Sequence, residues 1–319
     1  HLSLNSHLDS KMDVALELLD TYVLDSVYAK VFPAPVLANS TTAAITSSLT
    51  RDNDFRICLS LFVVVTLGGW FFYLTAACFS YFVFFDHETM KHPRFLKNQV
   101  RLEIECAVSA VPGFTILTVP WFWGEVKGYS RLYDGTTAYG GIPYMLFTIA
   151  LFLLTTDFGI YWIHRYLHHP YVYKWLHKPH HKWIVPTPFA SHAFHPLDGY
   201  LQSVPYHLFV YVFPMNKWLY ISMFLFVNVW TVMIHDGNYM LRSKVINSSA
   251  HHSVHHLYFN YNYGQYFTFW DRIGGSHRQP TDEQYNDVLR NDQKVWAKQA
   301  VDADRLEAKA LQSKKVKAN

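Results

Sequence analysis

Long apolar runs, separated by polar and charged segments, dominate the hydropathy pattern of the chain. The longest run, residues 57–85, contains no charged residue. Because about 20 apolar residues suffice to cross a bilayer core, this run predicts a transmembrane helix. Residues 106–123 are also uncharged and predict a second span, which two internal prolines should kink. Residues 142–163, in which Asp157 is the single charge, predict a third span.

A fourth apolar region, residues 200–234, consists of two shorter stretches separated by FPMNKW. Each is short for an independent span, so we expect a helical hairpin or a re-entrant pair shielded from lipid. The pattern therefore predicts an all-α integral membrane protein with about four spanning helices and a cytosolic helical cap. It divides the chain into an N-terminal segment (1–55), a membrane-embedded domain (56–278) and a charged, solvated C-terminal tail (279–319).

Lysine and arginine residues in the short loops predict the orientation, because translocated loops are poor in positive charge. The 86–103 loop carries four of these residues and the 124–141 loop carries two, and the segment after residue 163 is basic again. The histidine-rich segments should therefore face the cytosol, and the N-terminal segment should face the lumen. A sequon at Asn39 would then be accessible to glycosylation, whereas the sequon at Asn247 would be silent.

The two ends of the chain suggest three further expectations. Residues 1–11 precede Met12, the expected natural start, and no signal-peptide pattern is visible. The final residues, Lys315 to Asn319, match a KxKxx endoplasmic-reticulum retrieval pattern.

The composition narrows the class of protein further. Half of the residues are hydrophobic and only 16% are charged, against roughly 25% in ordinary soluble domains, which argues against a soluble enzyme. The three cysteines (Cys58, Cys78 and Cys106) form no CxxC pair, which excludes a disulfide framework and a cysteine–zinc site. A net charge of +3 without a basic stripe argues against nucleic-acid binding.

Histidines carry the chemical signal. Thirteen of the 19 lie within residues 164–195 and 235–256, in a pattern of one HxxxH box followed by two HxxHH boxes. Residues four apart lie on one helix face, so two imidazoles of one box can share a metal ion. Pro179 should separate two elements inside the second box. The box histidines are His164 and His168, then His177, His180 and His181, and finally His252, His255 and His256.

So many imidazoles exceed what one metal ion needs, because a catalytic zinc takes about three protein ligands and a structural zinc about four. We therefore expect a pair of metal ions, with His195 and His235 as additional ligands. Imidazole suits iron, copper, nickel and zinc alike. Iron is favoured by the setting, since a membrane face suggests an apolar substrate with unactivated C–H bonds. The carboxylates that could hold ligand N–H groups are Asp157, Asp198 and Asp236.

Other histidines are open to simpler interpretations. His169, His192 and His251 adjoin the boxes and could be ligands or hydrogen-bonded neighbours. The isolated His87, His92, His207 and His277 are expected to lie outside any metal site. Two other classes stay open: a metal transporter, whose ligands should lie at mid-membrane, and a b-type haem carrier, which needs only paired histidines.

The boxes resemble those of the fatty acid hydroxylase superfamily of membrane non-haem iron enzymes. Over roughly residues 55–278 the chain is similar to the sterol C5-desaturase (lathosterol oxidase) branch, chiefly through KHPRFLKNQV and TPFASHAFHPLDG. Sterol C4-methyl oxidases and fatty acid hydroxylases share the short boxes, so hydroxylation of a sterol or acyl chain is the alternative.

This resemblance implies an endoplasmic-reticulum enzyme that uses two iron ions and O₂ to desaturate a Δ7-sterol. Electrons would come from NAD(P)H through cytochrome b5 and its reductase. It implies that the eight box histidines hold the metal ions, with His195 and His235 as additions and with His169 as the alternative to His168. We expect a sterol pocket walled by Phe158, Tyr161, Trp162 and Trp230. A basic surface for cytochrome b5 is expected at Lys174, Lys178, Lys182 and Arg242.

Overall fold

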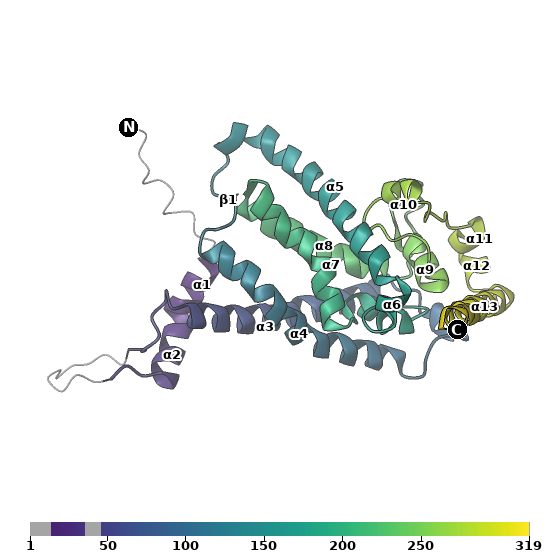
Figure 1. Ribbon diagram of the computed structural model, residues 1–319, viewed down its shortest axis with the longest axis horizontal. Coiled ribbons are helices and arrows are strands. Elements are labelled where there is room, and N and C mark those ends of the chain that lie inside the picture. The colour runs from purple at the N-terminus through teal and green to yellow at the C-terminus, as the bar shows by residue number, and fades with distance from the viewer. Residues whose placement is uncertain (1–13, 36–45, 319) are drawn as a thin grey trace.

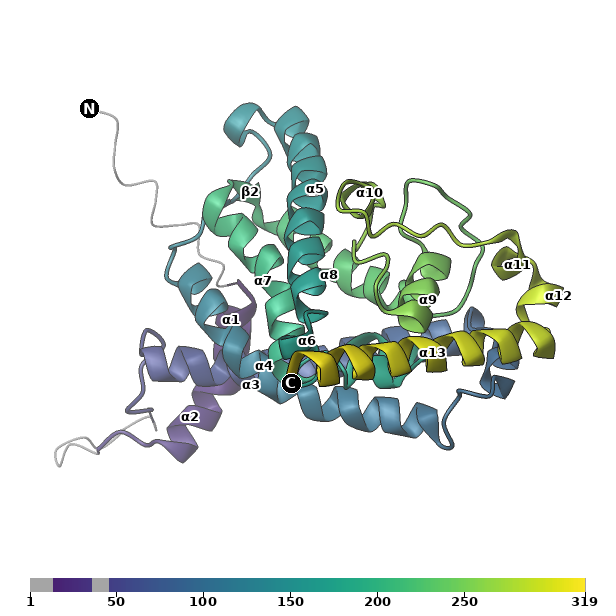
Figure 2. The same ribbon diagram turned by 45° about the vertical axis from the view of Figure 1, so that its right-hand side comes forward.

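The computed structural model describes residues 14–35 and 46–318. The expectations about Met12 and the Asn39 sequon lie outside the described residues, as does the last residue of the KxKxx pattern. Helices dominate, and the N-terminal helices and the C-terminal helices lie at opposite ends of the molecule (Figures 1 and 2). The N-terminal elements are α1 (Val14–Leu19), the π-helix η1 (Asp20–Leu24) and α2 (Asp25–Val31).

Four helices among the described residues are long and apolar enough to cross a membrane. They are α3 (Asp54–Val83), α4 (Gln99–Val126), α5 (Ile142–Leu167) and α8 (Lys217–Ile234). This number confirms the predicted all-α membrane fold with about four spans. Residues 200–234 fall in the shorter α7 (Pro196–Val212) and in α8. Because α8 alone is long and apolar enough to span, the expectation that each stretch is too short for an independent span was wrong for the second stretch.

Helix α4 extends beyond the predicted apolar run because its first turns make buried polar contacts. The fully buried carboxylate of Glu103 accepts hydrogen bonds from Gln99 Nε2 (2.7 Å) and from the Thr187 backbone N–H and hydroxyl. A buried carboxylate needs such donors. These bonds attach α4 to the loop that leads into the 3₁₀ helix η5 (Pro188–His192).

Glycines let the membrane helices approach closely. A Cβ on Gly159 of α5 would lie 2.8 Å from the Pro205 ring of α7, and a Cβ on Gly113 of α4 would lie 2.8 Å from the Pro196 ring. Small residues at such crossings are a common device of membrane helix packing. Helices α3 and α4 run side by side, and α7 packs against both α4 and α5 (Figure 1).

Short elements tie the ends of the long helices together. The two-residue strands β1 (Leu132–Tyr133) and β2 (Met215–Asn216) pair in parallel, with Leu132 opposite Met215. Beside them lies an apolar core that includes Phe152 and Phe209. Two further 3₁₀ helices are η2 (His87–Lys91) and η3 (Ala138–Gly140).

The segments that follow α5 and α8 form the cap that carries most of the box histidines. Its elements are α6 (Pro170–Tyr173), η4 (His180–Lys182), η5, α9 (Ser249–Tyr258) and α10 (Phe269–Ile273). Pro179 stands at the N-cap of η4, so it separates His177 from the next element as predicted.

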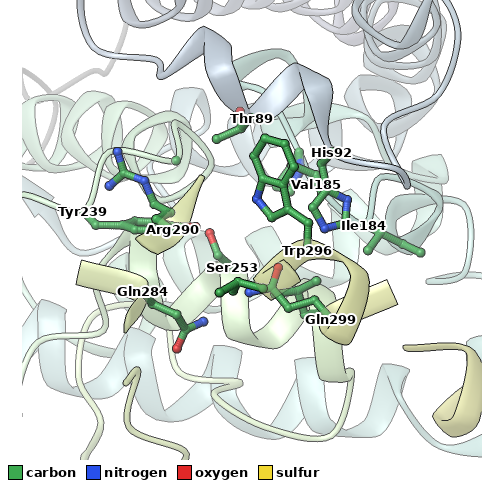
Figure 3. Close-up of a pocket in the computed structure, with 14 residues that line it drawn as sticks. Thr89, His92, Ile184, Val185, Tyr239, Ser253, Gln284, Arg290, Trp296 and Gln299 are labelled. Atoms are coloured by element: carbon green, nitrogen blue, oxygen red, sulfur yellow. The ribbon is translucent and has the colours of Figure 1, made fainter. Parts of the chain in front are cut away.

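The C-terminal segment docks on this cap instead of extending into solvent as we expected. It comprises α11 (Asp282–Tyr285), α12 (Asp287–Arg290) and α13 (Gln293–Ala318). The Trp296 side chain of α13 is 6% exposed, and its ring centroid lies 5.6 Å from that of His92 (Figure 3). Arg290 pairs with Asp86 at 2.8 Å. Apolar burial by Trp296 explains the difference from the sequence-based expectation.

Candidate functional site

Nine imidazoles gather in two clusters, within each of which one nitrogen per ring lies within 4.8 Å of all the others. The clusters draw on four separate parts of the chain. The first cluster is His164, His168, His177, His181 and His255, and the second cluster is His180, His235, His252 and His256.

The local structure of each segment explains this convergence. His164 and His168 are one turn apart at the C-terminal end of α5, and His235 is the C-cap of α8. Helix α9 presents the third box from within the cap, where all three of its histidines are buried. The ends of two membrane helices therefore meet the helices of the cap.

The two clusters are immediate neighbours. The ring centroids of His181 and His256, one from each cluster, are 4.9 Å apart. His252 and His255 stack at 5.4 Å on the same face of α9. The arrangement therefore suits two metal ions side by side.

Hydrogen bonds at the outer ring nitrogens assign the tautomers in the first cluster. His164 Nδ1 donates to the Tyr263 carbonyl oxygen (3.0 Å), and His177 Nδ1 donates to Asp198 Oδ2 (2.7 Å). In a neutral imidazole the other nitrogen then carries a lone pair. The two Nε2 atoms lie 3.1 Å apart, so two lone pairs face each other. This contact is repulsive unless a cation lies against both nitrogens.

The second cluster repeats this pattern. His235 Nδ1 donates to the Thr231 carbonyl oxygen (2.7 Å), and its Nε2 lies 2.9 Å from His252 Nε2 and 3.4 Å from His180 Nε2. A metal ion about 2.1 Å from each nitrogen would place neighbouring ligand atoms roughly 3.0–3.4 Å apart. The observed separations fit this geometry, so the residues present fit two metal ions.

The electrostatics also favour neutral ligands. Burial, reinforced by the neighbouring imidazoles, lowers the pKa of His252 and of His256 well below the ordinary histidine value. Imidazoles that stay neutral keep their lone pairs for a cation.

Of the three carboxylates expected to orient ligand rings, only Asp198 does so, through His177. Asp157 instead accepts the backbone N–H groups of Gln265 (2.9 Å) and Tyr266 (2.7 Å), and Asp236 accepts that of Asn238 (2.7 Å). Asp157 therefore shapes the loop that follows α9, and Asp236 shapes the loop that follows α8. The other ring acceptors include the backbone carbonyl oxygens of Tyr263, Thr231 and Tyr261. Sequence reasoning missed these carbonyl groups because backbone groups leave no residue signature.

The structure does not bring His195 to either cluster. Its side chain is exposed and accepts the Leu197 backbone N–H at the N-cap of α7 (3.2 Å), because the following proline starts a helix there. His169 is also exposed, and His168 occupies the cluster position. His251 serves the capping box of α9, and His192 bonds the Asn228 side chain (3.2 Å).

A cavity of about 330 Å³ opens onto both clusters. Helices α3, α4, α5, α7 and α8 contribute to its wall, and His164, His180 and His252 are among the histidines that line it. None of the four predicted wall aromatics lines this cavity. Phe158 and Trp162 are instead exposed on the outer face of α5. The polar residues Gln202 and Asn228 interrupt apolar stretches of the sequence and both line the cavity. They were the sequence feature that could have indicated its position.

Comparisons with known proteins place the chain among sterol-modifying enzymes. The "Fatty acid hydroxylase" family model matches residues 149–276. No solved structure matches the chain.

Three curated relatives are similar over nearly the whole chain. A Delta(7)-sterol 5(6)-desaturase of Aspergillus fumigatus is 49% identical over 92% of this chain and 94% of its own length. A probable Delta(7)-sterol 5(6)-desaturase of Neurospora crassa is 47% identical over 92% and 94%. One of Schizosaccharomyces pombe is 50% identical over 89% of both chains. The chain therefore belongs to the Delta(7)-sterol 5(6)-desaturases of the fatty acid hydroxylase family.

Proposed function

We propose that the protein is a sterol C5-desaturase that converts a Δ7-sterol into a Δ5,7-sterol in the endoplasmic-reticulum membrane. The sterol loses one hydrogen from each of two neighbouring carbons. Dioxygen, together with two electrons and two protons from the donor system, becomes two molecules of water. The observation that carries the proposal is a pair of histidine clusters, with nitrogen lone pairs directed at one another, at one end of a largely apolar cavity.

The nine clustered histidines would hold two iron ions, five in the first cluster and four in the second. Two iron ions with O₂ supply the oxidising power that unactivated C–H bonds require. The set consists of neutral nitrogen donors, which suits iron as well as other first-row metals. His195 is omitted from this ligand set because its side chain caps α7.

The remaining groups orient and shield these ligands. Asp198 fixes the His177 ring, and the carbonyl oxygens of Tyr263, Thr231 and Tyr261 fix the rings of His164, His235 and His255. Outer partners of this kind normally hold the tautomer that metal binding requires. The apolar cavity wall excludes bulk water and accepts a lipid-soluble substrate.

Cytochrome b5, reduced by its reductase, is proposed as the electron donor on the cytosolic face. Lys174, Lys178 and Lys182 are exposed on the cap, within the segment that carries the second box. Such charges would steer an acidic partner. Arg242 contributes less, since its guanidinium pairs with Asp282.

The test uses the full-length protein expressed in cells that lack an endogenous C5-desaturase. We expect loss of the Δ7-sterol and appearance of the Δ5,7-sterol, with about two iron ions per purified chain and no haem absorption band. A hydroxylated sterol or acyl product would contradict desaturation. Metal movement across vesicles without sterol turnover would instead indicate a transporter.

A further inference from the structure

Two glutamine side chains at the cavity each use their amide nitrogen in a hydrogen bond and, among the described residues, receive none at their amide oxygen. Gln202 of α7 and Gln265, in the loop after α9, both line the cavity that opens onto the clusters. Gln202 Nε2 donates to Asp198 Oδ1 (2.8 Å), and Gln265 Nε2 donates to Thr231 Oγ1 (3.0 Å). Among the described residues, nothing donates a hydrogen bond to Oε1 of either side chain.

Their partners fix the orientation of both amides. The Asp198 carboxylate can only accept, so the nitrogen of Gln202 must face it. The Thr231 hydroxyl already donates its single hydrogen to the Val227 carbonyl oxygen (2.8 Å), so it can only accept from Gln265. Each carbonyl oxygen is therefore the end of its amide that remains available.

Both amides lie at the histidine end of the cavity. Gln202 is one turn along α7 from Asp198, which holds His177, and Gln265 bonds Thr231, one turn from His235. The opposite end is formed by apolar side chains such as Val65, Phe122 and Leu225. Leu225 precedes His235 by ten residues of α8, about 15 Å along the axis. Acceptors at one end and hydrocarbon at the other suit a long apolar molecule with one terminal hydroxyl group.

A sterol has this shape, and its chemistry sets the direction in which it binds. One methylene separates the carbon that carries the hydroxyl from the nearer of the two reacting carbons. When the reacting carbons approach the clusters, the hydroxyl must therefore lie at the same end. We infer that Gln202 and Gln265 form a sterol-hydroxyl site in which the hydroxyl donates its hydrogen to their carbonyl oxygens. This inference rests on the proposed function.

A competing acceptor exists farther along α7. His207 also lines the cavity, and its Nδ1 lies 3.4 Å from the Tyr220 hydroxyl. Its Nε2 has no hydrogen-bond partner within the part of the chain that the structure describes. A hydroxyl at His207, five residues beyond Gln202, would place the reacting carbons away from the histidines. Chemical connectivity therefore favours the two glutamines.

The experiment compares two substrates on the same iron-loaded, full-length preparation: a Δ7-sterol and its analogue with hydrogen in place of the hydroxyl. The wild type should prefer the hydroxylated sterol in kcat/KM by at least about tenfold. In Gln202→Met/Gln265→Met this preference should fall to within about threefold, because only the hydroxylated sterol loses a hydrogen bond. His207→Leu should keep the wild-type preference. Because each preference is a ratio of two kcat/KM values measured on one preparation, the fraction of misfolded protein cancels.

The possible failures are distinguishable. If the double variant loses activity on both sterols equally and keeps the preference, the glutamines act only on structure and the inference is overturned. Loss of the preference in His207→Leu alone would assign the hydroxyl to the other end. Equal kcat/KM of the wild type for both sterols would overturn this inference and leave the proposed function standing. Failure of the iron-loaded wild type to desaturate either sterol would overturn the proposed function and this inference with it.

Discussion

Oδ2 of Asp198 lies 2.7 Å from Nδ1 of His177, and both side chains are fully buried. The carboxylate thus holds one ring of the first cluster in the tautomer whose Nε2 lone pair points at His164. The same carboxylate accepts a hydrogen bond from Gln202 Nε2. Asp198 therefore both orients the His177 ring and holds a side chain of the cavity wall.

Asp198→Asn should lower iron affinity or turnover by about 10- to 100-fold, as loss of an outer hydrogen bond to a ligand typically does. Iron per chain and kcat for sterol desaturation measure the effect. Asp134→Asn is the matched control, because Asp134 pairs with Lys217 near the two short strands, away from the histidines. Equal effects of the two changes would argue against the orienting role.

Membership of a cluster predicts different outcomes for two histidine variants. His255→Ala should remove a buried ring of the first cluster and abolish turnover with loss of bound iron. His195→Ala should retain the iron and lose only a helix cap, at about 1 kcal/mol. Iron content by mass spectrometry separates the two, and loss of iron in His195→Ala would refute the assigned ligand set.

Gly68, in the middle of α3, lines the cavity, and a Cβ at this position would meet no atom within 4 Å. Gly68→Leu should therefore stabilise the helix by about 0.5–1 kcal/mol while it reduces kcat/KM for the sterol by about tenfold, because the new side chain occupies substrate space. Leu67→Phe is the control, since Leu67 is 55% exposed. Unchanged kcat/KM in Gly68→Leu would place the sterol elsewhere.

Trp296 anchors α13 on the cap beside His92 and Val185 (Figure 3). Trp296→Ala should destabilise the protein by about 3 kcal/mol, the usual cost of removing a buried tryptophan side chain. Thermal unfolding of the detergent-solubilised protein measures it. Val301→Ala, on the same helix at a position that is 58% exposed, should change stability by less than about 0.5 kcal/mol. Similar losses in both variants would contradict the docking of α13.

Acid should weaken the same contact. Burial lowers the pKa of His92 from 6.5 to about 4, and the charge of Arg94 adds to this effect despite a hydrogen bond with Gln299. The unfolded chain binds this proton below pH 6.5 and the folded chain does not. Stability from neutral His92 is therefore complete above pH 6.5 and is lost as the pH falls toward 4. Melting temperatures at pH 7 and pH 5 should differ more in the wild type than in His92→Asn.

Local sequence patterns were sufficient for most of the membrane helices and for the histidines that gather in the site. The uncharged run 57–85 predicted most of α3, and residues 142–163 predicted most of α5, because lipid demands an unbroken apolar helix of fixed length. The histidine boxes indicated a metal pair because spacing on a helix sets which rings share a face. Even the break at Pro179 followed from local geometry.

The distribution of the histidines between the two clusters was set only by the tertiary structure. Each HxxHH box is divided between the two clusters: His180 joins the second while His177 and His181 join the first, and His255 joins the first while its neighbours on α9 join the second. Rings adjacent in sequence point in different directions, and their partners come from helices distant along the chain. The exclusion of His195, the carbonyl groups that hold the rings and the wall of the cavity follow from the same cause, since contacts between distant segments leave no periodicity in the sequence.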